Sequence, residues 1–414
     1  MALMLAVLAV LAAWLLFASL VLAVIYRQAA RRFWREPVLK RPVLIFESDD
    51  WGAGPVEQIE RLEQITACLC VHRDSAGNSP VMTLGVVLAI ADGVKIETEN
   101  FSKYHALDLS APQFHALVQT MQAGVARGVF SLQLHGMEHY WPETLLAVSR
   151  DSESVRTWLK RSPESWTEDL PSHIQSRWCD SAVLPSRPLP ALAIQTAVRA
   201  EVRRFTEIFG GAPRVVVPPT FVWNAQVEQT WAEAGVKYLV TPGRRYESRS
   251  VAGRPVAGSG GSMSNGDVAP SGIIYLVRDV YFEPAQGHRP EKVVEQIECA
   301  VRLGRPTLLE THRSNFVRDE LVAADSLIAL SKAIELALRD YPQILFLSTV
   351  ALADKIEVND RSLIEQDIGA RLVVCWARLS TISRLRKFAL LSGVGLLVWG
   401  VFRLLNLIHL EKAK

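Results

Sequence analysis

Short apolar segments alternate with helix-like segments through most of the chain, and this alternation constrains the fold more than any other feature. Near-continuous apolar strands separated by helices are typical of a parallel sheet that is covered on both faces. Roughly eight such units over about 320 residues predict an α/β fold, an irregular or incomplete (β/α)7-8 barrel. The expected strands are 43–47, 81–88, 129–134, 214–217, 237–240, 273–277, 307–310 and 344–347, and the expected helices are 56–66, 112–127, 191–209, 225–234, 291–303 and 320–339.

Two stretches interrupt this pattern. Residues 140–188 are rich in Trp, Ser, Pro and charged side chains, and we expect them to form an insertion or lid. Residues 252–272 are rich in Gly, Ser and Pro, and we expect a mobile loop there. No G-x-G-x-x-G or Walker pattern follows an expected strand, so nucleotide binding has no support in the sequence.

Both ends of the chain are predicted to be membrane segments. Residues 1–26 carry no charged side chain and exceed the roughly 20 apolar residues that span a bilayer. They lack the basic start and cleavage site of a signal peptide, so we expect an uncleaved anchor. Residues 388–410 form a weaker apolar segment that could span the bilayer, re-enter it or lie in its interface. The barrel is then expected at 42–365, between basic linkers at 27–41 and 366–387.

The charge of the chain is unevenly divided. The net charge is +2 overall, but it is +5 for residues 1–41, −10 for residues 42–370 and +7 for residues 371–414. The acidic middle argues against nucleic acid as a partner. The basic flanks favour an inner-membrane protein whose barrel faces the cytoplasm. The chain has five cysteines, an odd number, and their spacing is not that of a disulfide framework. This agrees with a reducing compartment.

Unusual residues follow four of the expected strands, and three of these strand ends carry chemically reactive side chains. Paired aspartates, Asp49 and Asp50, come after the first strand and are costly to bury unless they are paired or bound to a cation. His135 and His139 follow the third strand, at a spacing that lets both reach one metal. Such a set leaves an open coordination position, which a catalytic metal needs. His312 follows the seventh strand and could donate a proton.

These segments resemble the motifs of the polysaccharide deacetylase family, the NodB-type carbohydrate esterases of family 4. The resemblance covers about residues 41–355 and implies an irregular (β/α)7-type barrel of the glycoside hydrolase and deacetylase type, with a divalent metal that is usually Zn²⁺. It implies that Asp50, His135 and His139 are metal ligands. It also makes Asp49 the general base and His312 the general acid.

A third motif of the family corresponds to Pro218, Pro219 and Thr220, after the fourth strand. The resemblance implies that the backbone N–H of Thr220 helps to hold the oxyanion. The family's usual arginine, which orients the catalytic aspartate, is missing from this stretch. Arg278, at the end of another strand, is a candidate replacement.

The chain departs from the family pattern at two further positions. Trp51 separates Asp50 from Gly52, and Gly136 stands where Ser or Thr usually follows the first histidine. We assign candidate oxyanion or substrate contacts to Thr220, Pro219, Arg278, Asp279 and Trp51. Each residue taken alone also has an ordinary structural explanation, such as a turn, a cap or a salt bridge; only their joint occurrence at strand ends favours a metal site.

The favoured function is a metal-dependent hydrolase that removes N- or O-linked acetyl groups from a membrane-associated saccharide, such as a lipid-linked glycan or an exopolysaccharide. The alternative is a saccharide-binding subunit of a polysaccharide synthase or export complex that has lost turnover. A glycosidase ranks last, because adjacent Asp49 and Asp50 are poorly placed to flank a glycosidic bond from opposite sides.

Overall fold

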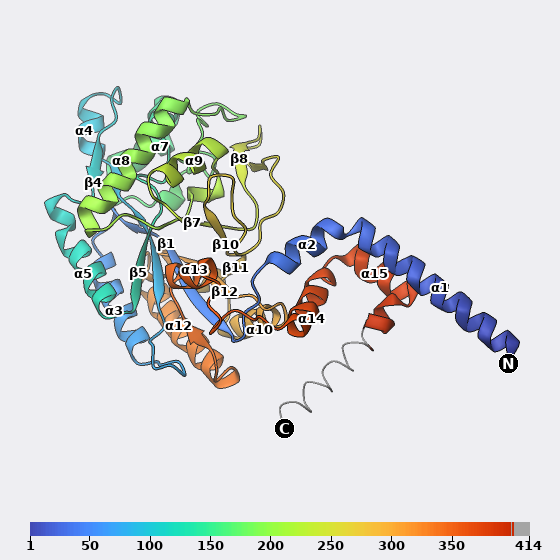
Figure 1. Ribbon diagram of the computed structural model, residues 1–414. Coiled ribbons are helices and arrows are strands. Elements are labelled where there is room, and N and C mark those ends of the chain that lie inside the picture. The colour runs from blue at the N-terminus through green and yellow to red at the C-terminus, as the bar shows by residue number, and fades with distance from the viewer. Residues whose placement is uncertain (399, 401–414) are drawn as a thin grey trace.

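The fold is a curled parallel sheet surrounded by helices (Figure 1). The computed structural model describes residues 1–398 and residue 400. The strands of the main sheet are β1 (Val43–Gly52), β2 (Met82–Val87), β5 (Phe130–Leu134), β6 (Val215–Val216), β7 (Tyr238–Thr241), β10 (Ile274–Val277), β11 (Val280–Tyr281), β12 (Thr307–His312) and β13 (Leu345–Phe346). All eight predicted strands are present, and the pairings of the main sheet are parallel.

The sheet curls without closing through hydrogen bonds. Its strands lie in the order β10-β7-β6-β5-β2-β1-β12-β11, with β13 paired to the start of β1. The two edge strands, β10 and β11, are neighbours in sequence, joined by Arg278 and Asp279. The structure is therefore the predicted incomplete barrel, and Arg278 enters from its open seam.

The predicted helices form the outer layer of the barrel. They are α3 (Gln58–Cys70), α5 (His115–Ala126), α8 (Ala191–Phe209), α9 (Ala225–Glu233), α10 (Pro290–Arg302) and α12 (Glu320–Asp340). Neighbouring helices pack against each other: α3 contacts α5 and α12, α10 contacts α12, and α8 contacts α9. The Asn224 side chain caps α9 by accepting a hydrogen bond from the Val227 N–H, as such residues do at helix starts.

Side chains alternate between the two faces of β1. Leu44 and Phe46 pack in the core cluster that includes the outer helices, whereas Val43 and Ile45 pack in a second cluster inside the barrel. Helix α13 (Thr349–Glu357) contributes Leu352 and Ile356 to this inner cluster. Because strand side chains repeat every two residues, Glu47 and Asp49 continue the inner column. The barrel interior is thus apolar where β1 begins and acidic where it ends.

The interrupting stretches carry structure of their own. The insertion contains α6 (Pro142–Asp151), α7 (Glu153–Arg161) and the short helix η2 (Thr167–Asp169). The Gly/Ser-rich stretch includes β9 (Pro255–Ala257), which pairs with β8 (Tyr246–Arg249). Strands β3 (Ala89–Ala91) and β4 (Ala106–Asp108) form a second antiparallel pair, and α4 (Gly93–Thr98) lies between them in the chain.

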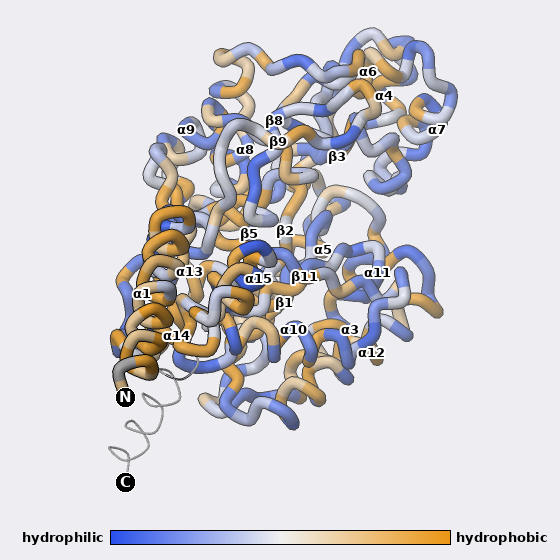
Figure 2. The backbone as a smooth tube through the Cα atoms, turned by 90° about the vertical axis from the view of Figure 1, so that its right-hand side faces the viewer, coloured by the Kyte–Doolittle hydropathy of each residue, from blue (hydrophilic) through white to orange (hydrophobic). Residues whose placement is uncertain are grey.

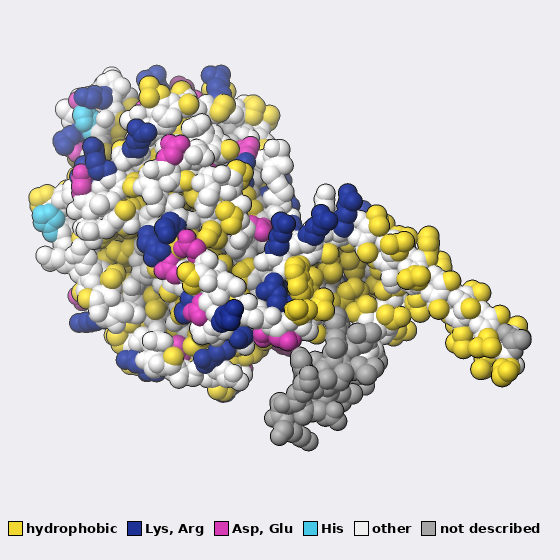
Figure 3. All heavy atoms as spheres, in the orientation of Figure 1, with side chains coloured by type: hydrophobic (Ala, Val, Ile, Leu, Met, Phe, Trp, Pro, Cys, Tyr) yellow, Lys and Arg dark blue, Asp and Glu magenta, His cyan; other side chains and the backbone are white. Residues whose placement is uncertain are grey.

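The chain ends form a helical arm beside the barrel (Figure 1). It contains α1 (Ala2–Ile25), α2 (Arg27–Arg35), α14 (Ile368–Leu379) and α15 (Ser383–Ser392), so the two stretches expected to be linkers are largely helical. Within the described residues, one segment, Leu3–Ile25, is long and apolar enough to cross a bilayer. It is the continuous hydrophobic tube in Figure 2 and the apolar surface in Figure 3. Residues 399 and 401–410 of the predicted segment 388–410 lie outside the described residues.

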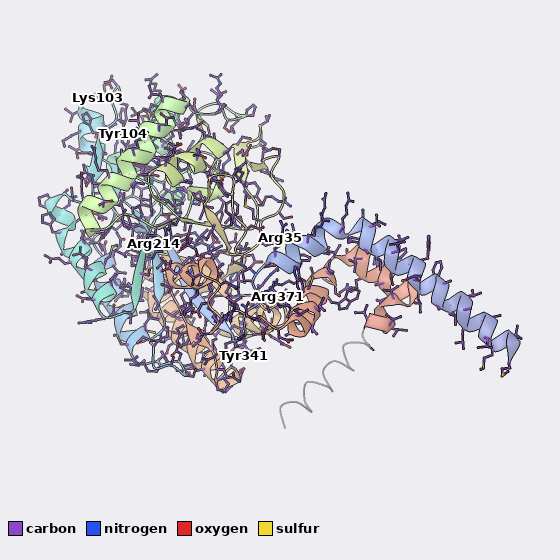
Figure 4. All side chains as sticks on the ribbon, in the orientation of Figure 1. Arg35, Lys103, Tyr104, Arg214, Tyr341 and Arg371 are labelled. Carbon is purple, nitrogen blue, oxygen red and sulfur yellow. The ribbon has the colours of Figure 1, made fainter. Side chains whose placement is uncertain are left out.

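The arm is tied to the barrel by polar contacts. Within the arm, Arg371 on α14 donates to the Trp34 carbonyl of α2 at 2.6 Å, near the junction with the barrel (Figure 4). Between arm and barrel, Arg305 forms an ion pair with Glu36 at 2.7 Å. Arg378 is buried and donates to five backbone carbonyls, those of residues 33, 36, 37, 303 and 304. Since α1 also packs on α15 through Ala18 and Leu22 against Leu385 and Ala389, the described helices of the arm form one unit.

Candidate metal centre and active site

A bulge at the end of β1 directs both aspartates into the barrel. Ser48 pairs with Leu84 and Trp51 with Val86, so Asp49 and Asp50 together face the single residue Gly85. Asp50 takes a positive φ of 72°, a strained conformation for a residue with a side chain. In a regular strand two successive side chains would point to opposite faces. The bulge instead buries both carboxylates, at 1% and 4% relative exposure.

Gly85 makes room for this arrangement. A Cβ atom added to Gly85 would lie 2.4 Å from Oδ1 of Asp49. That separation is far below a normal contact, so only glycine fits opposite the bulge. The acidic pair at the end of β1 therefore depends on a residue in the next strand.

Asp50, His135 and His139 converge on one point. Oδ1 of Asp50 lies 3.3 Å from Nε2 of His135 and 3.4 Å from Nε2 of His139. Nδ1 of His135 lies 2.8 Å from the Val217 carbonyl oxygen, which assigns the proton to Nδ1 and leaves a lone pair on Nε2. That lone pair faces a buried carboxylate oxygen that has no hydrogen-bond partner among the described residues.

This donor set fits a divalent metal. Two ligand atoms each about 2.0–2.1 Å from a tetrahedral Zn²⁺ would lie roughly 3.3–3.4 Å apart, which matches the observed separations. Burial acts to lower the pKa of His135, but Asp49 and Asp50 raise it overall. Burial lowers the pKa of His139 to about 4, and His135 adds to this effect. The three side chains thus favour a cation between them and could hold a metal ion.

A buried ion network contacts the loop that carries the two histidines. Arg177, from the insertion, forms an ion pair with Glu138 and lies 3.2 Å from Glu201 of α8. Glu201 also accepts a hydrogen bond from the Met137 N–H at 3.0 Å. Because Glu138 and Met137 lie between His135 and His139, this network fixes the spacing of the two candidate ligands.

Asp49 is bound by Arg278. Nη2 of Arg278 donates to Oδ2 of Asp49 at 2.6 Å, and Nη1 donates to Glu47 at 2.9 Å. Nε lies 3.2 Å from Oε2 of Glu310, a close ion pair without hydrogen-bond geometry. Burial works to raise the pKa of Asp49, yet Arg278 and His135 hold it below its usual value. Asp49 is thus an ionised carboxylate whose other oxygen, Oδ1, has no hydrogen-bond partner in the described structure.

His312 lies next to Asp49 across the β1–β12 ladder, where the two residues are register partners. Its Nδ1 lies 2.6 Å from Oε1 of Glu283, whose other oxygen accepts a hydrogen bond from Asn315. Burial works to lower the pKa of His312, but Glu283 and Asp50 raise it to about 10. At neutral pH His312 is therefore a cation that can donate a proton from Nε2.

These groups border one cavity of about 280 Å³. Of the predicted site residues, it is lined by Asp49, Asp50, His135, His139, Thr220, Arg278 and His312. Thr220 has a positive φ of 52° and its hydroxyl lies 2.7 Å from that of Ser176. The barrel places all these side chains together because they follow the carboxyl ends of parallel strands.

Three predicted substrate contacts lie elsewhere. Trp51 is fully buried in the outer core, and its Nε1 donates to the Ser48 hydroxyl. It is placed there because the chain has resumed normal alternation after the bulge. Pro219 is buried beside Gly136 and does not line the cavity. Asp279 is exposed on the other side of the strand end from Arg278.

Several cavity residues were not predicted from the sequence. Glu310, Glu168, Gln175 and Tyr281 line the cavity, and Glu283 orients His312 from behind. The sequence could have indicated Glu310, because it lies two residues before His312 and therefore on the same face of its strand. Glu168 and Gln175 lie in the insertion, far from any strand end, so no sequence pattern placed them.

Comparisons with known proteins give structural matches only. No family model matches the chain, and no curated protein matches its sequence. Among solved structures, the chain is similar to a T48 deacetylase with substrate, at 12% identity and a TM-score of 0.35, covering 77% of this chain and 92% of that one. It is similar to a family 4 carbohydrate esterase from Streptomyces lividans in complex with acetate, at 12% identity and a TM-score of 0.33, covering 73% and 90%.

A third similar structure is a CE4 family pseudoenzyme from Bacillus anthracis, at 10% identity and a TM-score of 0.36, covering 76% of this chain and 66% of that one. The solved structures to which the chain is similar thus include deacetylases, the family whose motifs its sequence resembles. Since these TM-scores are low, the function proposed below rests on the geometry of the site itself.

Proposed function

We propose that the protein is a metal-dependent deacetylase that hydrolyses N- or O-acetyl groups of a saccharide. The observation that carries this proposal is the juxtaposition of three groups in one cavity: the Asp50–His135–His139 donor set, ionised Asp49 and protonated His312. A divalent cation, which we propose to be Zn²⁺, would supply Lewis-acid polarisation of the acyl carbonyl there.

The side chains supply the proton transfers of the hydrolysis. Asp49 accepts a proton from the attacking water through Oδ1, while Arg278 holds its other oxygen in place. The water oxygen bonds to the acyl carbon and the carbon–nitrogen or carbon–oxygen bond then breaks. His312 gives its Nε2 proton to the leaving amine or alcohol, and Glu283 stabilises the cationic form beforehand. Thr220 also lines the cavity, and its proposed role is to contact the oxyanion through its backbone N–H.

The contact between Arg278 and Asp49 bears on the alternative of a binding subunit without turnover. The missing arginine after the fourth strand favoured that alternative. Arg278 reaches Asp49 from the open seam of the barrel at 2.6 Å, so a guanidinium orients this carboxylate by another route. This geometry supports the enzyme over the binding subunit.

The substitution Asp49→Asn tests the proposal. We expect acetate release to fall by about 10²–10⁴-fold, because the proton acceptor is lost, while the bound metal is retained because Asp49 is outside the donor set. Metal analysis of the purified chain, combined with an acetate-release screen over acetylated saccharides, measures both quantities. Asp279→Asn is the matched control, since Asp279 is exposed and outside the cavity. A folded wild-type chain that binds no divalent metal and releases no acetate would contradict the proposal.

We also propose that α1 anchors the protein in the inner membrane, so that its substrate is a membrane-associated glycan. The support is the apolar Leu3–Ile25 segment, followed directly by the basic residues of α2. By the positive-inside rule these residues favour the cytoplasmic face for the barrel. Tethering places lipid-linked glycans and polysaccharide synthase or export machinery within reach.

A further inference from the structure

The insertion contributes an unpaired carboxylate to the cavity. Glu168, in η2, lines the cavity with Asp50 and His139. Both of its carboxylate oxygens are buried, and neither has a hydrogen-bond partner among the described residues. A buried carboxylate without donors is costly, so this side chain is suited to a ligand that brings its own donors.

The turn that carries Glu168 is fixed in position. The Arg313 guanidinium lies 4.9 Å and that of Arg318 5.8 Å from the centre of the Trp166 ring. Asp169 forms an ion pair with Arg318 at 2.5 Å. Because both arginines belong to the connection between β12 and α12, the insertion is pinned to the barrel on each side of Glu168. The carboxylate is therefore held in place at the cavity before a ligand arrives.

Glu168 is separate from the candidate metal ligands. The ligand atoms of Asp50, His135 and His139 all lie within 4.8 Å of one another, and Glu168 is not part of this group. It is also distinct from the hydrogen-bonded pairs Asp49–Arg278 and His312–Glu283. Glu168 thus lines the cavity outside the candidate donor set, and its two oxygens have no hydrogen-bond partner among the described residues that would compete with a substrate.

We propose that Glu168 is a specificity-determining residue that accepts hydrogen bonds from hydroxyl groups of the acetylated sugar and excludes sugars carrying a carboxylate at that position. The inference rests on the proposed function and names its substrate class, neutral rather than uronic-acid glycans. Hydroxyl groups donate to a carboxylate and satisfy its lone pairs. A carboxylate on the sugar beside Glu168, Asp50 and Glu310 would be repelled and left without partners.

The experiment compares the full-length wild-type protein in detergent, loaded with Zn²⁺, with Glu168→Gln. The substrates are an N-acetylglucosamine oligomer, the same oligomer with alternating uronic acids, and 4-nitrophenyl acetate, which has no sugar hydroxyls. Glu164→Gln is the control, because Glu164 is an exposed residue of the same insertion. For Glu168→Gln we expect KM for the neutral oligomer to rise about tenfold, as for loss of a hydrogen bond to a charged group. The ratio of kcat/KM for the neutral oligomer to kcat/KM for the uronic oligomer should become smaller.

In the same variant, bound zinc should stay at the wild-type value, and KM for 4-nitrophenyl acetate should rise much less than KM for the neutral oligomer. A fall in bound zinc would make Glu168 a metal ligand and overturn the proposal. A parallel loss with all substrates would make it structural, and an unchanged KM for the neutral oligomer would also overturn it. If the wild type released no acetate at all, the proposed function would fail separately; equilibrium binding of the neutral oligomer, weakened about tenfold by Glu168→Gln, would still decide the role of Glu168.

Discussion

At the scale of single residues, the site separates an acid from a base by giving each a different partner. Asp49 pairs with the guanidinium of Arg278, which keeps its pKa low, and His312 pairs with Glu283, which raises its pKa to about 10. When the environments of two titratable groups drive their pKa values apart in this way, the difference indicates which group is the base and which is the acid. Both groups then have the required charge over a wide range around neutral pH.

Glu283→Gln should change the pH dependence of the enzyme. His312 must be protonated to act as the acid, so activity is lost as pH rises through its pKa. Burial lowers this pKa and Glu283 raises it, and removing the carboxylate should therefore lower it, by about one to three units. We expect the alkaline limb of kcat/KM to move to lower pH by that amount. An alkaline limb that stays in place would show that another group sets it.

At the scale of elements, the metal site is assembled by two local irregularities. The bulge in β1 turns Asp50 into the barrel, and the loop after β5 presents His135 and His139. Arg177 connects this loop to the insertion and to α8 through Glu138 and Glu201. The insertion, which appeared in the sequence as an interruption, thus supports the candidate metal ligands.

Arg177→Met should weaken metal binding although Arg177 is not itself in the candidate donor set. Loss of the guanidinium leaves Glu138 and Glu201 buried together without their cation, so the histidine loop should shift. Partners behind metal ligands typically contribute 10–100-fold to metal affinity. We expect a loss of that size in Zn²⁺ competition titrations. The control is Arg203→Met, which removes an exposed arginine from α8, the helix that carries Glu201. This variant should bind Zn²⁺ like the wild type.

At the scale of the whole molecule, the arm contacts the barrel at the Gly/Ser-rich loop, where Arg32 donates to the Ser262 hydroxyl at 2.6 Å, and at the starts of two strands. Arg378 binds carbonyls just before β1 and just before β12, at the starts of these strands. The site lies at their ends, about 15–20 Å away for strands of five to six residues. None of the described residues that line the cavity belongs to the arm, so the proposed membrane anchor and the site are separate parts of the molecule.

Reporter fusions test how the whole chain is placed. If the basic flanks orient the protein, a phosphatase that is active only outside the cytoplasm should be inactive when fused after residue 40 or after residue 370. A fluorescent protein fused at the same positions should fluoresce. Active phosphatase at both positions would place the barrel on the outer side of the membrane.

Much of the fold follows from periodicities in the sequence. All eight strands and all six helices expected from apolar patterning are present, and helix 191–209 has the predicted bounds. The hairpins β3–β4 and β8–β9 and the short strand β11 were not predicted. Such short elements carry too few residues for a pattern, and they form because neighbouring segments supply their hydrogen bonds.

The sequence by itself determined which residue types stand at the strand ends, because parallel strands with period-two alternation bring Glu47, Asp49, Glu310 and His312 to one face and one edge. Only the tertiary structure decided that Asp50 also turns inward and that Trp51 packs in the core, since both depend on a bulge opposite Gly85. It also decided that Arg278 and Glu168 reach the cavity, from the seam and the insertion. Those contacts join residues distant in sequence, and no local pattern encodes them.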